Sequence, residues 1–230
     1  MPIRGCFINY TLNQLFSTRY NDCPSPLALF YEVTQTQKVL KNLLLGLDII
    51  GRDILNFINH KPAQYIIGSL LTCKNFGHHD TYIFPEFSIG NGKYYADYLI
   101  VGKNSGGYEF VFVELEAPNK RTTIKSGYEG QAMRSGLNQI FDWKCQIESD
   151  FASITKEFEK SCIQIEKLPI EFRQYDSTRM HYMVIAGLRD DYNDVTYRTR
   201  RLRSREQGIE MYHYDNLIDF SKLLEDSPAF

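Results

Sequence analysis

The chain has 230 residues, with 26 Lys and Arg against 28 Asp and Glu, and a formal net charge of −2 at pH 7. Hydrophobic residues make up 43% and charged residues 23%, a balance that excludes collagen-like, low-complexity and disordered proteins. Apolar runs such as Leu43 to Leu47 are far shorter than the roughly 20 residues of a membrane helix, so we expect no membrane span. With so little net charge, a site for a polyanion would need local clusters of basic residues.

The N-terminal sequence and the cysteines both favour a reducing compartment inside the cell. The N-terminal sequence lacks the apolar core and small-residue cleavage site of a secretory signal, so we expect a cytoplasmic protein. The five cysteines are an odd number without a C-x-x-C pair, which predicts neither a disulfide framework nor a zinc site. We interpret them as reduced packing residues.

The first third of the chain has helical periodicity. Between Pro26 and Leu45 the apolar residues recur at about helical spacing, and a second such segment precedes the sequence His60-Lys61-Pro62, which ends it because proline disfavours helical geometry before it. The predicted apolar positions are Leu29, Val33, Val39 and Leu43 in the first segment, and Ile50, Ile54, Leu55 and Ile58 in the second. We predict a small helical N-terminal subdomain over residues 1–75 and a second domain over residues 76–230.

From Thr81 the hydrophobic period changes to two, and aromatic and β-branched residues dominate residues 81–84, 94–101 and 110–115. Short glycine turns at 90–93 and 104–107 connect these segments, which predicts an antiparallel β-meander. A helix of about 20 residues is expected after the polar stretch past Pro118, because apolar residues recur there at helical spacing. Its predicted apolar stripe consists of Met133, Leu137, Ile140, Phe141 and Ile147.

The last part of the chain alternates again between the two periods. After a second helical stretch, Met183 to Ala186 is typical of a buried strand. A helix over Asp194–Gln207, a strand over Ile209–Tyr214 and a short terminal helix from Leu217 complete the predicted order.

Acidic residues on the predicted strands are the unusual feature. If both turns close symmetrically, Glu86 faces Asp97 and Asp97 faces Glu114, which places three carboxylates in one row, with Glu116 two residues further on. Two such charges about 5 Å apart repel by roughly 3 kcal/mol at an effective dielectric near 20. A cation would offset that cost, and oxygen ligands favour Mg²⁺, Mn²⁺ or Ca²⁺. The alternatives are a solvated sheet face, or a turn shifted by one residue, which puts Glu86 on the opposite face.

The signatures of several other enzyme classes are absent. The sequence contains no G-x-S-x-G, H-E-x-x-H, G-x-x-x-x-G-K-[ST] or G-x-G-x-x-G, so serine hydrolase, zincin, P-loop and Rossmann functions are not indicated. His78-His79-Asp80 could form a metal or proton-transfer site, but its place in a predicted loop favours a surface role.

A family resemblance rests on four segments around these acids. Pro85-Glu86-Phe87, Ala96-Asp97-Tyr98-Leu99, Val113-Glu114-Leu115-Glu116-Ala117-Pro118 and Gln139-Ile140-Phe141-Asp142-Trp143 resemble the nuclease domain of Shedu anti-phage defence proteins, members of the PD-(D/E)XK nuclease superfamily. The resemblance covers roughly residues 76–225. It implies an α/β (α+β) restriction-endonuclease-like core with a mixed sheet flanked by helices, a homo-oligomer, and a metal-dependent DNA endonuclease.

The resemblance also implies roles for individual residues. Asp97 and Glu114 would hold Mg²⁺ or Mn²⁺, with Glu86 as a further metal ligand, and Gln139 matches a glutamine that related nucleases place on the following helix. Glu116 falls where the superfamily most often has lysine, so it would serve as a general base or a second metal ligand.

Positive charge for such a site must then come from elsewhere in the chain. Lys93 or Lys120 could replace the missing lysine charge. If neither does, the fold would be a catalytically silent DNA-binding or assembly module, and a hydrolase of small phosphoesters is a third reading.

Two groups of basic residues could contact the phosphates of DNA. On a helix, three of the five arginines between residues 198 and 205 share one face, and another group directly follows the acidic strand. The candidate DNA-binding residues are Arg198, Arg201 and Arg205, together with Lys120, Arg121 and Lys125. The alternative for the arginine group is a solvated helix face.

Overall fold

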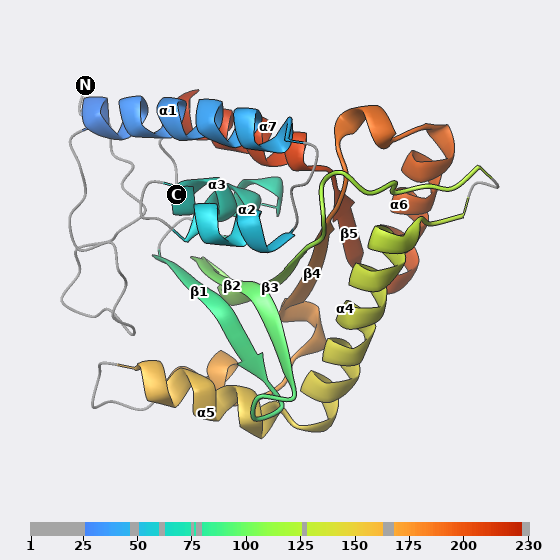
Figure 1. The fold of residues 1–230 in the computed structure, drawn as a ribbon. Helices are drawn as coiled ribbons and strands as arrows, with labels where there is room; N and C mark the ends of the chain where they lie inside the picture. The colour runs from blue at the N-terminus through green and yellow to red at the C-terminus, as the bar shows by residue number, and fades with distance from the viewer. Residues whose placement is uncertain are drawn as a thin grey trace.

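The computed structural model describes residues 26–46, 51–59, 63–74, 76, 80–125, 128–162 and 168–226. In this part of the chain, one five-stranded sheet in the order β1-β2-β3-β4-β5 lies between two layers of helices, which makes a mixed α/β fold (Figure 1). His60, Pro62, His78 and His79 lie outside the described residues, as do Cys6 and Cys23.

The first three strands form the predicted antiparallel meander. They are β1 (Asp80–Ile89), β2 (Tyr94–Asn104) and β3 (Gly107–Leu115). The pairs Phe87↔Ala96 and Tyr98↔Val113 confirm the register expected from symmetric turns. The first turn closes because Gly90, Asn91 and Gly92 all adopt positive φ, at 64°, 57° and 88°, a region that glycine and asparagine tolerate.

The last two strands run parallel to β3 and make the sheet mixed. Strand β4 (Met180–Ile185) pairs with β3, and β5 (Ile209–Tyr212) pairs with β4. The predicted strand at 183–186 is therefore confirmed with a start three residues earlier. The predicted strand at 209–214 is shorter than expected, because the last helix begins at Tyr214.

The helices that connect these strands also agree with the sequence pattern. Helices α4 (Gln131–Ser149) and α5 (Phe151–Ser161) connect β3 to β4, and α6 (Asp194–Gln207) connects β4 to β5. Helix α6 has the predicted bounds, since a capping box at Asn193 starts it and Gly208, with φ 65°, ends it. Short 3-10 helices lie at Ser69–Lys74, Ile170–Phe172, Ser177–Arg179 and Arg189–Asp191.

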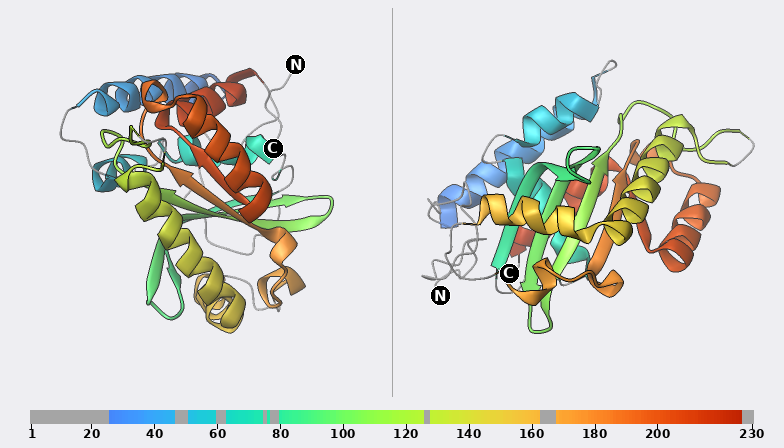
Figure 2. Two further views of the ribbon diagram at one scale, coloured as in Figure 1. Left: turned by 90° about the vertical axis from the view of Figure 1, so that its right-hand side faces the viewer. Right: turned by 90° about the horizontal axis from the view of Figure 1, so that it is seen from below.

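Two hydrophobic clusters cover the two faces of the sheet (Figures 1 and 2). Helices α4 and α5 pack on one face, and the other face is covered by α1 (Pro26–Leu44), α2 (Gly51–Ile58), α3 (Gln64–Gly68) and α7 (Tyr214–Asp226). The N-terminal helices therefore share a core with the sheet. The division of the chain at residue 75 stays a prediction.

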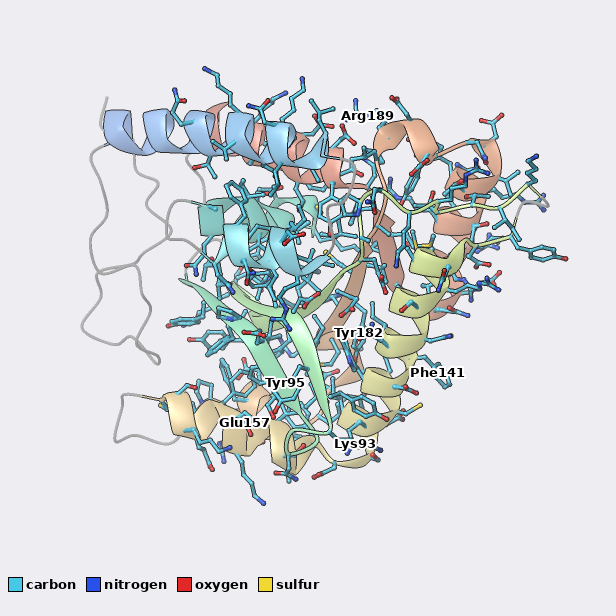
Figure 3. All side chains as sticks on the ribbon, viewed as in Figure 1. Lys93, Tyr95, Phe141, Glu157, Tyr182 and Arg189 are labelled. Carbon is cyan, nitrogen blue, oxygen red and sulfur yellow. The ribbon has the colours of Figure 1, made fainter. Side chains whose placement is uncertain are left out.

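The predicted apolar stripes need two corrections. Phe141 is 64% exposed and lies on the outer side of α4, while the buried Trp143 takes its place in the core (Figure 3). Val39 is 50% exposed, because α1 buries the face that carries Leu40 and Leu44. Hydrophobic spacing locates the buried face of a helix only to within about one position, because consecutive residues are about 100° apart around the helix axis.

Other sequence expectations can be compared with the described residues only. In α2, Ile54, Leu55 and Ile58 are buried as predicted, whereas the side chains of Leu29 and Val33 lie outside the described set. None of the described cysteines, Cys73, Cys145 and Cys162, is part of a disulfide. Within the described ranges, none of the helices combines the length and apolar character that crossing a membrane requires.

Candidate active site

Asp97, Glu114 and Glu116 form an acidic centre, which lies where β2 and β3 stop pairing. The ladder ends at Tyr98↔Val113, and the preceding residue of β2, Asp97, contacts the end of β3 through its side chain. Its Oδ2 accepts a hydrogen bond of 2.7 Å from the Leu115 N–H. This bond fixes the Asp97 carboxylate next to the segment that carries Glu114 and Glu116.

Burial dominates the electrostatics of this centre. Glu114 is only 7% exposed, and burial, followed by the charges of Asp97 and Glu116, raises its pKa to about 9. Burial likewise raises the pKa of Asp97 to about 6, against the hydrogen bond from Leu115 and the charge of Arg52. The pKa of Glu116 is also raised by burial. Three carboxylates are thus close enough to disfavour one another's ionisation, which is the situation that a cation would relieve.

Helix α4 supplies two polar partners to these acids. Ser135 hydrogen-bonds to Glu116, and Gln139 hydrogen-bonds to Glu114. The spacing explains the match, because residues four apart share one face of a helix and residues two apart share one face of a strand. Gln139 was predicted from sequence at this place. Ser135 was missed, although it lies one helical turn before Gln139.

The close approach of α4 depends on Gly136. A Cβ at this position would lie 2.8 Å from Val184 Cγ1 and 3.2 Å from Glu116 Cγ, so only glycine fits without a shift of the neighbouring atoms. The helix can therefore press Ser135 and Gln139 against the strand.

A buried tyrosine fixes the backbone at Glu116. The Tyr214 O–H donates a hydrogen bond of 2.6 Å to the Glu116 carbonyl, and the Tyr214 N–H donates one of 3.1 Å to Gly187 O. Burial, followed by the negative charges of Asp97, Glu116 and Glu114, holds the pKa of Tyr214 well above its ordinary value, so its O–H remains a donor. The sequence predicted Tyr214 only as the last residue of a strand and gave no sign of this contact.

Glu86 does not join the other acids. It is exposed, its φ is 47°, and its Oε1 accepts a hydrogen bond of 2.6 Å from Arg52 of α2. Among the residues that the structure describes, no three His, Cys, Asp or Glu side chains are placed to hold one metal ion. The expected convergence of Glu86, Asp97 and Glu114 is therefore not seen. The register is as expected, but the positive φ turns Glu86 toward the helical layer.

The two lysines considered as replacements for the missing motif lysine differ in position. The charge of Lys120 acts on Glu116 and lowers its pKa, against the larger effect of burial. Lys93 lies at the β1–β2 turn, where its Nζ is 3.4 Å from Gln146 Oε1 near the end of α4 (Figure 3). Only Lys120 is therefore placed at the acidic centre.

The two predicted basic groups belong to neighbouring segments. The segment between β3 and α4 extends beside α6 (Figure 1), and the Thr123 and Thr196 hydroxyls hydrogen-bond to each other. Arg203 of α6 also forms an ion pair of 2.6 Å with Glu129. We use the name basic surface for the six predicted residues, all of them exposed: Lys120, Arg121, Lys125, Arg198, Arg201 and Arg205.

The remaining arginines of α6 have structural partners. The Arg200 guanidinium lies 4.5 Å from the centre of the Tyr212 ring, and Arg203 pairs with Glu129. The face predicted from helical spacing is thus the face that α6 exposes. Arg205 pairs with Glu206 at 3.4 Å, but both side chains are largely exposed.

The described histidines do not belong to the acidic centre. His181 lies 2.9 Å from Glu109 and packs against Phe76, and His213 is buried beside Tyr192. Burial lowers the pKa of His213 to about 4, which keeps it neutral. Both histidines therefore pack within the fold.

Comparison with known families identifies the chain. The profile described as Shedu protein SduA, C-terminal, matches residues 49–218, well over half of the sequence. The chain therefore belongs to this family, as its motifs indicated. The matched region includes α2 and α3, so these helices lie within the part of the chain that the family profile covers. A comparison with curated proteins returned no match.

Proposed function

We propose that this Shedu chain is a divalent-metal-dependent endonuclease that hydrolyses phosphodiester bonds of DNA in anti-phage defence. One observation carries the proposal: Asp97 and Glu114 lie side by side in a buried setting that raises both of their pKa values. Buried neighbouring carboxylates cost stability, and such perturbed groups concentrate at functional sites.

The residues present fit a hard divalent cation. Asp97 and Glu114 offer oxygen donors only, and Mg²⁺ is commonly held by one or two carboxylates while it keeps several waters. Burial, followed by the negative charges of Asp97 and Glu116, raises the pKa of Glu114, and the hydrogen bond with Gln139 only partly opposes these effects. Mg²⁺ or Mn²⁺ held by Asp97, Glu114 and the Leu115 carbonyl would supply Lewis-acid activation of a phosphodiester.

In this proposal, other residues of the chain orient the carboxylates, accept a proton and offset negative charge. The Leu115 N–H and Gln139 orient the two carboxylates through hydrogen bonds, and Tyr214 holds the Glu116 backbone. Glu116, with a raised pKa and Ser135 as its partner, is placed to accept a proton from an attacking water. Lys120 is placed to offset negative charge that develops on the phosphate.

The basic surface is proposed to hold the DNA. Its six side chains are exposed and come from two segments that contact each other, so a phosphate backbone could cross both at once. Such contacts supply affinity without a preference for sequence. We further propose, from the family, that the protein acts as a homo-oligomer in the cytoplasm.

Cleavage of supercoiled plasmid DNA tests this function. Incubation of the full chain with Mg²⁺ or Mn²⁺ should give nicked or linear plasmid, and EDTA should prevent it, because the carboxylates act only through a cation. Binding of the same plasmid should be measured alongside by gel shift.

A second function is favoured by one specific observation. Glu116 stands where a lysine is most common in the superfamily, and the acidic centre accordingly lacks a cation on its own strand. A catalytically silent DNA-binding or assembly module would bind the plasmid and leave it intact with either metal. That result would replace the endonuclease proposal.

A further inference from the structure

We propose that Arg52 of α2 is a phosphate-binding residue of the acidic centre, held at the site by Glu86 and released to a DNA phosphate when DNA binds. This inference rests on the proposed function in that it takes DNA as the ligand. It adds a contact from the N-terminal helical layer to a site otherwise built on β2, β3 and α4.

The first observation is the ion pair itself. Arg52 Nη1 lies 2.6 Å from Glu86 Oε1, and the two side chains are 60% and 52% exposed. An ion pair this exposed contributes little to stability, since water and salt screen it. It can therefore exchange one oxyanion partner for another. A guanidinium binds phosphate through the same planar fork that it presents to a carboxylate.

The second observation is the backbone that presents Glu86. Its φ of 47° is unusual for a residue with a side chain. The ladder between β1 and β2 is interrupted there, with Pro85↔Tyr98 on one side and Phe87↔Ala96 on the other. The unpaired position lies across from Asp97. Unfavourable backbone geometry of this kind concentrates at functional sites and ligand clamps.

The third observation places Arg52 within electrostatic reach of the acids. Its ion-pair partner Glu86 occupies the position of β1 that lies across from Asp97, so the Arg52 charge acts on the Asp97 carboxylate. Lys120 acts in the same way on Glu116 from the segment after β3. Arg52 thus supplies, from α2, positive charge of the kind that a lysine at the position of Glu116 would provide.

Two variants of the same ion pair separate this proposal from a structural role. Arg52→Gln removes the phosphate contact, so affinity for a duplex oligonucleotide in EDTA should fall roughly tenfold. The slope of log affinity against log salt should also fall, by roughly 0.9 for one lost contact. Glu86→Gln removes the competing carboxylate, so affinity should rise and the slope should not fall. Arg52→Lys should lie between wild type and Arg52→Gln.

A matched control comes from α5, where the exposed Lys160 forms an ion pair of 2.7 Å with Glu157. Lys160→Gln should leave affinity and slope unchanged. Equal effects of Arg52→Gln and Glu86→Gln, or no effect of either, would overturn the proposal, as would wild-type protein that does not bind DNA. Because these readouts need no metal and no cleavage, an inactive wild type would reject the endonuclease proposal and still leave Arg52 tested.

Discussion

The acidic centre and the basic surface are built in opposite ways. Asp97 and Glu114 are largely buried, their pKa values are raised, and backbone or helix side chains hold each carboxylate. The basic surface consists of exposed side chains on helix α6 and on the segment between β3 and α4. Under the proposed function, the difference corresponds to two tasks. Chemistry at one phosphate requires fixed groups away from water, whereas attraction of a polyanion requires only accessible charge.

The largest expected effect comes from neutralising one buried acid. Glu114→Gln keeps the size of the side chain and its place beside Gln139 but removes the charge. DNA cleavage should fall by roughly 10²- to 10³-fold or more, while the folded state is retained. Single-turnover cleavage together with a thermal melt checks both parts. Glu148→Gln, an exposed change on α4, is the control, and equal activity of the two variants would separate Glu114 from the chemistry.

Charge reversal on the basic surface should instead act on binding. With Arg198, Arg201 and Arg205 changed to Glu, DNA affinity should fall and its log–log salt slope should decrease by roughly 0.9 per lost phosphate contact. The matched control reverses Lys156 and Lys160, which are exposed on α5. A slope that does not change in the arginine variant would indicate that these arginines form a solvated helix face that does not contact DNA.

A smaller effect is expected from the helix that orients the acids. Gln139→Ala removes one hydrogen bond to the Glu114 carboxylate, and cleavage should fall by roughly 10- to 150-fold because such bonds to charged groups contribute about 1.5–3 kcal/mol. Affinity for DNA should not change, since Gln139 lies outside the basic surface. A loss of affinity as large as the loss of cleavage would contradict the separation of the two regions.

The smallest effect is a pH dependence of stability in metal-free protein. The pKa of Glu114 is raised from 4.5 to about 9 in the folded state, so the folded state binds more protons than the unfolded state between these values. The free energy of unfolding should therefore decrease as pH rises toward 9. His213, whose pKa is lowered from 6.5 to about 4, acts in the opposite direction but only below its ordinary value.

The measurement is the melting temperature in EDTA between pH 7 and pH 9. It should decrease by a few degrees, since about 1 kcal/mol shifts the Tm of a chain of this size by roughly 2–4 °C. Glu114→Gln should flatten this decrease. A slope that is the same in wild type and variant would show that Glu114 does not titrate in this range.

The sequence was most informative where local rules determine the outcome. Glycine turns fixed the register that brings Asp97 beside Glu114, and helical spacing identified the exposed arginines of α6. Gln139 was found through its family motif. Each of these inferences depends on residues close together in the chain, or on strands joined by a short turn.

The sequence was least informative where distant segments meet. No local sequence pattern indicates that Glu86 pairs with Arg52 of α2, or that the Tyr214 hydroxyl donates to the Glu116 carbonyl. The contact between Thr123 and Thr196, which joins the two basic groups, is likewise formed by tertiary packing. Such contacts depend on how layers stack, and hydrophobic periodicity does not specify that.

Binding of Mn²⁺ to DNA-free protein, measured by calorimetry, tests the central claim most directly. Three proteins should be compared: wild type, Asp97→Asn, and Asp142→Asn, which changes an exposed acid on α4. The account predicts that wild type and Asp142→Asn bind the ion alike, and that Asp97→Asn loses the binding while it remains folded. Equal binding by all three proteins, or none by wild type, would contradict a metal centre at Asp97 and Glu114.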